Sequence, residues 1–192
     1  MEHQTTIDLT HDSMVFCAGH FTIFSATERE RLHGHNFWVG LAVTGRVDDN
    51  GLLSDYSAFR RTMIGLCREL HEVFLLPDRS PHLELRRDGG RVEAIFDGKA
   101  IPFLEEDVRV LPVRNVSLEE LSRYLCERFL DAQGVLDDDA VVAVEVRVCS
   151  KPKQCASFAW KRNRRDAHDG DAHDGDAYDG DAQDADAQHR TR

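Results

Sequence analysis

The stretch Glu30-Arg31-Leu32-His33-Gly34-His35 decides how the whole chain is interpreted. On a β-strand the side chains alternate between two faces, so His33 and His35 point to the same side. Gly34 between them leaves room for a close approach of the backbone. Histidine is a frequent metal ligand, and the segment therefore predicts two ligands on one strand face.

A third histidine lies just upstream, in the segment Phe16-Cys17-Ala18-Gly19-His20. The period of two places the apolar residues Phe16 and Ala18 on the same face as His20. If the two segments pair as neighbouring strands, three imidazoles converge on one point. Three neutral imidazoles with one open position form a catalytic zinc site, so we predict Zn²⁺ at the three histidines. Other divalent ions accept the same ligands, which leaves the identity of the metal open.

Two other histidine patterns do not fit this chain. A cupin needs a Glu a few residues beyond the His pair, and residues 36–41 contain none. A zincin needs a second His four residues after the first, and Leu75 stands at that place after His71-Glu72.

Composition limits the class of protein. The chain of 192 residues suits one domain with accessories, and it contains no apolar run of membrane-spanning length. The N-terminus lacks the basic and apolar regions of a signal peptide. The five cysteines are odd in number and show no CxxC spacing. We therefore expect reduced thiols and a cytoplasmic protein.

The net charge of −11 is unevenly distributed. Residues 166–192 hold nine Asp and two Arg, a contribution of −7, which leaves −4 for residues 1–165. A mildly acidic core without a basic patch excludes nucleic acid as an expected partner.

Apolar periodicity predicts the elements of the first half. Strands are expected over residues 13–24 and 35–47, joined by the charged loop 25–31. A helix is expected to begin at Ser54-Asp55, with an apolar face that reaches Phe74 and an end set by Pro77.

The second half begins with residues 78–112, which read as short strands joined by glycine turns. We interpret them as a β-rich insertion whose role the sequence does not show. Ser117 is the expected N-cap of a second helix, with Glu120 completing a capping box and Gly134 ending the helix. Two further strands are expected over residues 140–148 and 155–160.

Because strands and helices occur in separate blocks, the predicted fold class is α+β. We expect a four-stranded antiparallel sheet with two helices on one face, plus the insertion. The predicted division is an N-terminal extension (1–12), one domain (13–161) and a disordered tail (162–192). The Asp-rich repeats of the tail cannot bury a core.

Phe16-x-Ala18-x-His20 followed by Leu32-His33-Gly34-His35-Asn36-Phe37 resembles the 6-pyruvoyltetrahydropterin synthase / 6-carboxytetrahydropterin synthase family. The similarity runs through about Lys161. It implies the tunnelling fold, in which trimers close their sheets into a barrel and commonly stack as hexamers, so a homo-oligomer is expected. It also implies zinc and the substrate 7,8-dihydroneopterin triphosphate, whose side-chain hydroxyls chelate the metal. Proton abstraction beside that chelate then leads to triphosphate elimination or carbon–carbon cleavage.

The first departure from the family pattern concerns the catalytic base. The family usually has a Cys four residues before the first His of the HGH motif, and this chain has Arg29 there. Arginine stays protonated and cannot act as a base. Glu30 instead gives Glu-x-x-His-Gly-His, which resembles a family branch that makes 6-hydroxymethyl-7,8-dihydropterin. A carboxylate near a dication can take a proton from a hydroxyl, so Glu30 is the predicted base. The alternative is that it belongs to a solvated charged loop.

The second departure lies at the end of the first predicted helix. The family pattern there is Leu-Asp-His, and this chain reads Leu70-His71-Glu72. An acid and an imidazole remain in swapped order, on helix positions about 100° apart. His71 and Glu72 are therefore candidate acid–base residues, with a plain helix-surface role for His71 as the alternative.

The third departure concerns the substrate ring. Where the family has a Glu that receives the pterin N–H groups, the matching position in this chain is Ser150, followed by Lys151. A serine offers no bidentate carboxylate. The pterin ring is therefore bound more weakly, or another acidic residue binds it, or the site binds a different ring. Asn115 and Ser117 match the family's Asn-x-Thr segment and complete the predicted substrate-binding set. Ser117 can cap the helix as well.

The sequence thus predicts a zinc-dependent lyase acting on a small pterin-type substrate, with 6-hydroxymethyldihydropterin as the favoured product. The same fold making 6-carboxytetrahydropterin for queuosine-type biosynthesis is the nearest alternative. A second alternative is a family member that binds metal and a heterocycle without turnover. A third is an enzyme whose substrate has no pterin ring.

Overall fold

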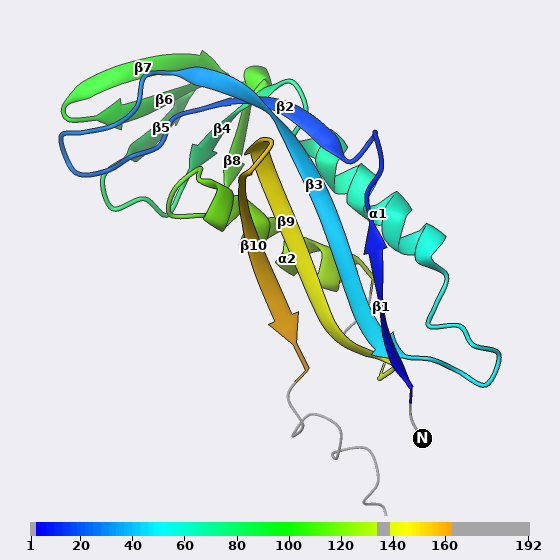
Figure 1. The fold of residues 1–192 in the computed structure, drawn as a ribbon. Coiled ribbons are helices and arrows are strands. Elements are labelled where there is room, and N and C mark those ends of the chain that lie inside the picture. The colour runs from blue at the N-terminus through cyan, green and yellow to red at the C-terminus, as the bar shows by residue number, and fades with distance from the viewer. Residues whose placement is uncertain (1–2, 134–138, 163–192) are drawn as a thin grey trace, which may run out of the picture. The chain divides into compact units, whose positions relative to one another are not determined.

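Long strands with alternating burial form the centre of the fold (Figure 1). The computed structural model describes residues 3–133 and 139–162. Along these residues the elements are β1 (Gln4–Leu9), β2 (Val15–His20), β3 (His33–Arg46), α1 (Tyr56–Glu69), β4 (Val73–Pro77), β5 (Glu84–Asp88), β6 (Arg91–Phe96), β7 (Lys99–Leu104), the 3-10 helix η1 (Glu105–Asp107), β8 (Val108–Leu111), α2 (Leu118–Gln133), β9 (Val141–Lys151) and β10 (Gln154–Lys161). The predicted helix end at Gly134 and the predicted tail beyond Arg162 lie outside the described residues.

The main sheet contains the four antiparallel strands that the sequence predicts, as β10-β9-β3-β2. It is larger than expected, because β4 and β8 continue it in parallel beyond β2, and β1 pairs with β3. The N-terminal extension therefore joins the sheet from Gln4 onward, earlier than expected. The α+β class is confirmed, with a curled sheet of mixed direction.

The first helix is shorter than predicted, and its expected last turn is a strand. Helix α1 ends at Glu69, and Glu72 follows with a φ of 59°. This left-handed residue redirects the chain, and its N–H donates to the carbonyl of Cys17 on β2. The run 73–77 then pairs in parallel with β2 and β8 as β4. Phe74 continues the helical spacing of the sequence only by coincidence.

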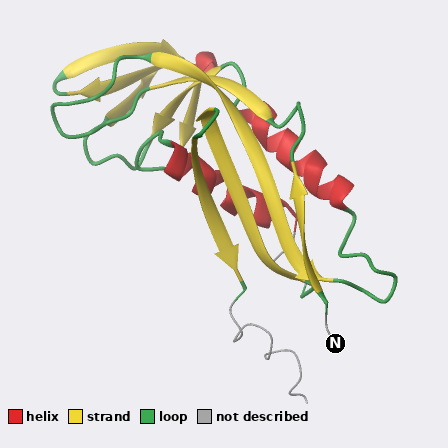
Figure 2. Cartoon of the chain, in the orientation of Figure 1, coloured by secondary structure: helices red, strands yellow, loops and turns green. Residues whose placement is uncertain are grey.

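The main core lies between one face of the long strands and the two α-helices (Figure 2). The strands contribute every second residue to it, which buries Phe37, Val39, Leu41 and Val43 of β3. The helices contribute their apolar faces, among them Phe59, Met63, Leu66, Leu121, Leu125 and Phe129. The apolar side chains at alternate strand positions and those on the helix faces pack against each other in this core.

The predicted β-rich insertion is confirmed as the three-stranded antiparallel sheet β5-β6-β7. Both central residues of each turn have a positive φ. They are Gly89 and Gly90 between β5 and β6, and Asp97 and Gly98 between β6 and β7. A second, smaller core joins this sheet to the loop after β2 and to β4, through Phe21, Ile23, Leu76, Leu83, Val92, Ala94 and Phe96.

The expectation of five reduced thiols is wrong for two of them. Cys149 of β9 and Cys155 of β10 form a disulfide across the hairpin. Sequence spacing could not show this pairing, because a register shift between Gln154 and Cys155 sets the two cysteines opposite each other. Cys17, Cys67 and Cys126 are free. The cytoplasmic location remains a prediction.

Replacing both Cys149 and Cys155 by Ser should lower the free energy of unfolding by about 2 kcal/mol, because the open chain gains the entropy that this short loop removes. Urea denaturation under non-reducing conditions measures the change. Cys17→Ser, at an exposed free thiol, is the control and should leave the midpoint in place. Equal stability of the double variant and the control would contradict the expectation.

A search of the described helices finds none that is both long and apolar enough to cross a membrane.

Candidate metal centre and active site

The pairing of β2 with β3 brings three histidines together. His20 lies directly opposite His33, and Ala18 lies opposite His35. The ring centroids are 4.5 Å apart for His20 and His33, 4.9 Å for His33 and His35, and 5.4 Å for His20 and His35. One nitrogen of each ring lies within 4.8 Å of the others, close enough to hold one ion.

Glycine permits this close pairing of the strands. A Cβ atom at Gly34 would lie 3.1 Å from the carbonyl oxygen of Ala18, tighter than ordinary contacts. The residue between His33 and His35 is therefore small because the neighbouring backbone occupies the space.

Backbone carbonyls set the tautomers of two of the rings. The Nδ1 of His20 lies 2.9 Å from the carbonyl oxygen of Val116, and the Nδ1 of His33 lies 2.7 Å from that of Arg31. Since a carbonyl only accepts, both Nδ1 atoms donate, and both Nε2 atoms keep a lone pair for a metal. The Nε2 of His20 is buried and has no partner among the described residues. A buried lone pair facing two other imidazoles fits a metal ligand.

Burial also favours the neutral imidazole form of His20 and of His35 by lowering the pKa of each. It is the largest cause that lowers the pKa of His20, and the neighbouring histidines add to it, against the opposing hydrogen bond to Val116. Burial likewise lowers the pKa of His35, with His33 and Lys151 as further causes. Neutral imidazole is the form that binds a metal ion.

Glu30 stands beside this cluster as an oriented carboxylate. Its Oε2 accepts a hydrogen bond from the N–H of Thr22 at 3.0 Å and lies 3.9 Å from the Nε2 of His33. Burial raises the pKa of Glu30, but the hydrogen bonds from Thr22 and the nearby His33 outweigh it and lower the pKa overall. The carboxylate is therefore ionised, and its side chain is 38% exposed.

Arg29, at the position of the family Cys, has no catalytic geometry. Its guanidinium carbon lies 5.0 Å from the ring centroid of Phe21 and 5.6 Å from that of Phe96. Its Nη1 donates to the carbonyl of Glu30 at 2.7 Å. The side chain therefore contacts two aromatic rings and the backbone of the predicted base.

His71 and Glu72 lie on the turn after α1, which corrects their expected placement on a helix. The Nδ1 of His71 accepts from the N–H of Cys17 at 3.1 Å, and Glu72 is 81% exposed with its carboxylate 3.7 Å from the His71 ring. Among the described residues, neither forms a hydrogen bond or ion pair with the three histidines. Their catalytic role stays a prediction.

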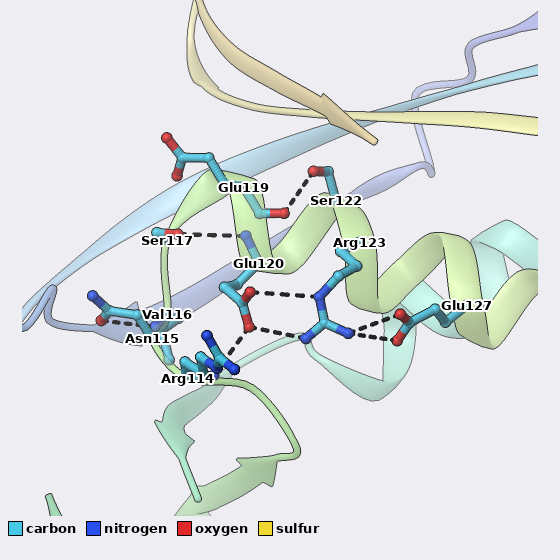
Figure 3. Close-up of polar contacts among 9 residues, drawn as sticks. All are labelled: Arg114, Asn115, Val116, Ser117, Glu119, Glu120, Ser122, Arg123 and Glu127. Atoms are coloured by element: carbon cyan, nitrogen blue, oxygen red, sulfur yellow. Dashed lines mark hydrogen bonds and ion pairs between the residues drawn. The ribbon is translucent and has the colours of Figure 1, made fainter. Parts of the chain in front are cut away.

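Asn115 binds the loop that carries Glu30. Its side-chain amide donates to the carbonyl of Ile23 at 2.8 Å and accepts from the N–H of Ile23 at 3.1 Å, as a strand partner would. Its Oδ1 also accepts from the N–H of Val116 at 3.0 Å (Figure 3). The sequence holds no signal for the Val116 carbonyl that orients His20, because a backbone carbonyl is present at every residue.

Ser117 caps helix α2 as predicted, by accepting from the N–H of Glu120 at 3.4 Å (Figure 3). The capping box is not reciprocal, however, because the Glu120 carboxylate accepts from the N–H of Arg114 and pairs with Arg123. This network fixes the turn that presents Val116 to His20. The substrate-binding roles of Asn115 and Ser117 stay predictions.

Asn115→Ala should lower the free energy of unfolding by about 2 kcal/mol, because the N–H and the carbonyl of Ile23 lose their partner in a partly buried position. Thermal or urea unfolding measures the effect. Asn36→Ala, at an exposed position of β3, is the matched control. An unchanged stability of Asn115→Ala would show that the loop does not depend on this amide.

Ser150 is buried, at 8% exposure, near the end of β9. It follows the disulfide cysteine Cys149, and the charge of the next residue, Lys151, helps to lower the pKa of His35. The end of this hairpin therefore lies near His35. Contact of Ser150 with a substrate stays a prediction.

Comparison with known proteins agrees with the sequence motifs. Residues 10–160 match the family described as 6-pyruvoyl tetrahydropterin synthase. A candidate 6-carboxy-5,6,7,8-tetrahydropterin synthase of Methanocaldococcus jannaschii is 22% identical over 139 residues, covering 72% of this chain and 85% of that protein. The 6-pyruvoyl tetrahydropterin synthase of Plasmodium falciparum superimposes with a TM-score of 0.78 at 27% identity, covering 83% of this chain and 99% of the other. The enzyme of Plasmodium vivax gives a TM-score of 0.78 at 24% identity, covering 84% and 100%.

Proposed function

The chain belongs to the 6-pyruvoyl tetrahydropterin synthase family, whose members are lyases, and we propose that it is a zinc-dependent lyase acting on 7,8-dihydroneopterin triphosphate. The observation that carries the proposal is the buried, unpartnered Nε2 of His20, which faces His33 and His35. These residues fit zinc by the chemistry of their donors and by their tautomers. Zinc bound there would act as a Lewis acid toward the side-chain hydroxyls of the substrate.

Glu30 is the proposed base of the reaction. Its ionised carboxylate, held by Thr22, would accept the proton of one side-chain hydroxyl. The adjacent carbon–carbon bond would then break, and the deprotonated hydroxyl would become the carbonyl of a departing aldehyde that keeps the triphosphate. The carbon left on the ring would take up a proton to give 6-hydroxymethyl-7,8-dihydropterin. A related protein lends support, since a catalytic residue of the Plasmodium vivax enzyme is a glutamate that has been replaced by alanine in one solved structure.

Formation of a 6-carboxytetrahydropterin is the second candidate. It is favoured by the name of the Methanocaldococcus jannaschii relative. The structure gives Arg29 no means of replacing the missing family Cys, because its side chain contacts the rings of Phe21 and Phe96. We therefore rank 6-carboxytetrahydropterin below 6-hydroxymethyl-7,8-dihydropterin as the proposed product.

We also propose that the protein forms a homo-oligomer, either a trimer or a hexamer, as the resemblance implies. The outer strands β10 and β8 support this proposal, because each is the end strand of the sheet in the described chain. Strands with an unpaired edge can continue a sheet into a second copy.

Mass-spectrometric identification of the product tests the proposed reaction. Zinc-loaded protein is incubated with 7,8-dihydroneopterin triphosphate, with chelator-treated protein as the control. Zinc-dependent formation of 6-hydroxymethyl-7,8-dihydropterin is the expected result. A 6-carboxy product would establish the second candidate, and unchanged substrate beside a fully loaded site would overturn both.

A further inference from the structure

We propose that the β-rich insertion is part of the catalytic apparatus, with Phe96 of β6 and Arg29 acting as positioning residues for Glu30. This inference rests on the proposed role of Glu30 as the base. It assigns a role to the small sheet β5-β6-β7 and to the arginine that stands where the family has its Cys.

The loop that carries Glu30 is a narrow hairpin. Its two sides meet at an isolated antiparallel bridge between Ile23 and Arg29. The N–H of Phe24 donates to the carbonyl of Glu28 at 2.9 Å, and the N–H of Glu30 donates to that of Thr22 at 2.9 Å. In the ribbon this loop runs beside the small sheet (Figure 1).

Apolar packing attaches the inner side of the hairpin to the insertion. Phe21 and Ile23 are 1% and 7% exposed, and they belong to the same core as Val92 and Phe96 of β6. This core is separate from the main one, and Leu76 of β4 also belongs to it.

Arg29 transmits this contact to Glu30. Its guanidinium lies over the rings of Phe21 and Phe96, and its Nη1 binds the carbonyl of Glu30. Among the described residues it has no carboxylate partner, so the two rings and the Glu30 carbonyl are its contacts. A guanidinium over aromatic faces is a directional interaction, which fixes the backbone that Arg29 holds. Thr22 holds the carboxylate end of the same residue.

A cavity of about 300 Å³ supports the assignment. Residues 27–31 line it on one side, and Phe96, Asp97 and Lys99 of the insertion line it on the other. The insertion therefore forms part of the wall beside the base.

The test compares Phe96→Leu with Phe103→Leu. Leucine keeps an apolar side chain but removes the ring beneath Arg29. Phe103 is the matched control, since it packs on Phe74 in the same small core and has no ring contact with Arg29 in the described structure. We expect Phe96→Leu to lower kcat about tenfold, the size of one cation–π contact, with KM and zinc content unchanged. Combined with Arg29→Met, it should lower kcat no further than Arg29→Met alone.

A second readout does not need turnover. Hydrogen exchange of the Glu30 amide, which donates to Thr22, should accelerate in Phe96→Leu and Arg29→Met and stay slow in Phe103→Leu. If the wild-type protein lacks activity, the proposed reaction fails while this exchange measurement still decides the positioning role. Wild-type protection of Glu30 in Phe96→Leu, or equal losses of kcat in Phe96→Leu and Phe103→Leu, would overturn the proposal.

Discussion

Replacing His35 by Ala is expected to weaken zinc binding by more than about 100-fold, because even the loss of a residue that only supports a ligand costs 10- to 100-fold. His35 is half-buried on β3, and its ring completes the cluster with His20 and His33. The removal of one imidazole leaves two ligands, too few for the stable tetrahedral site of zinc. Competition with a chromogenic chelator measures the affinity.

The matched control is His82→Ala. His82 is exposed and lies outside the three-histidine cluster, so its replacement should leave zinc affinity unchanged. A wild-type affinity in His35→Ala would exclude His35 as a ligand. Equal losses in both variants would show that zinc binds nonspecifically to exposed histidines.

Glu30→Gln is expected to lower kcat by about 10²- to 10⁴-fold, the usual contribution of a general base. Glutamine has nearly the same shape, and its amide oxygen can still accept the hydrogen bond from Thr22. The loop should therefore keep its conformation while losing the group that takes the proton. Product formation under saturating substrate and zinc measures the effect.

Glu28→Gln provides the control, because Glu28 is exposed in the same loop. Zinc content should be equal in both variants and in the wild type. Wild-type turnover in Glu30→Gln would eliminate this carboxylate as the base. A protein that binds metal and a heterocycle without turnover would show no product in any of the three.

The part of the site that the sequence predicts is the part that depends on period-two alternation. His33 and His35 share a strand face by geometry alone, and the strand of His20 is the neighbouring strand in the sequence. The start of α2, capped by Ser117, is also predictable, because the capping pattern spans only a few neighbouring residues.

The features that the sequence does not show depend on register and on backbone groups. The Cys149–Cys155 disulfide requires a register shift at the end of a hairpin. The apolar residues continue at helical spacing as far as Phe74, but Glu72 is left-handed and ends the helical path. Strand β4 therefore begins where the spacing predicts helix. The Val116 carbonyl that orients His20 belongs to a residue type that no metal motif specifies.

The contacts of Arg29 illustrate a further limit. The sequence shows only that an arginine replaces the family Cys, which excludes a base at that position. That its guanidinium lies over Phe21 and Phe96 follows from the second core, which joins segments more than 60 residues apart in sequence. Such long-range contacts depend on the folded topology rather than on local pattern.

X-ray absorption at the zinc edge of the loaded protein tests the central claim most directly. The three-histidine site predicts three imidazole nitrogens and one oxygen around each zinc, at one zinc per chain. Loss of the imidazole signal in His35→Ala should follow. A sulfur neighbour, an all-oxygen shell or a chain that takes up no zinc would contradict the claim that His20, His33 and His35 form an open catalytic metal centre.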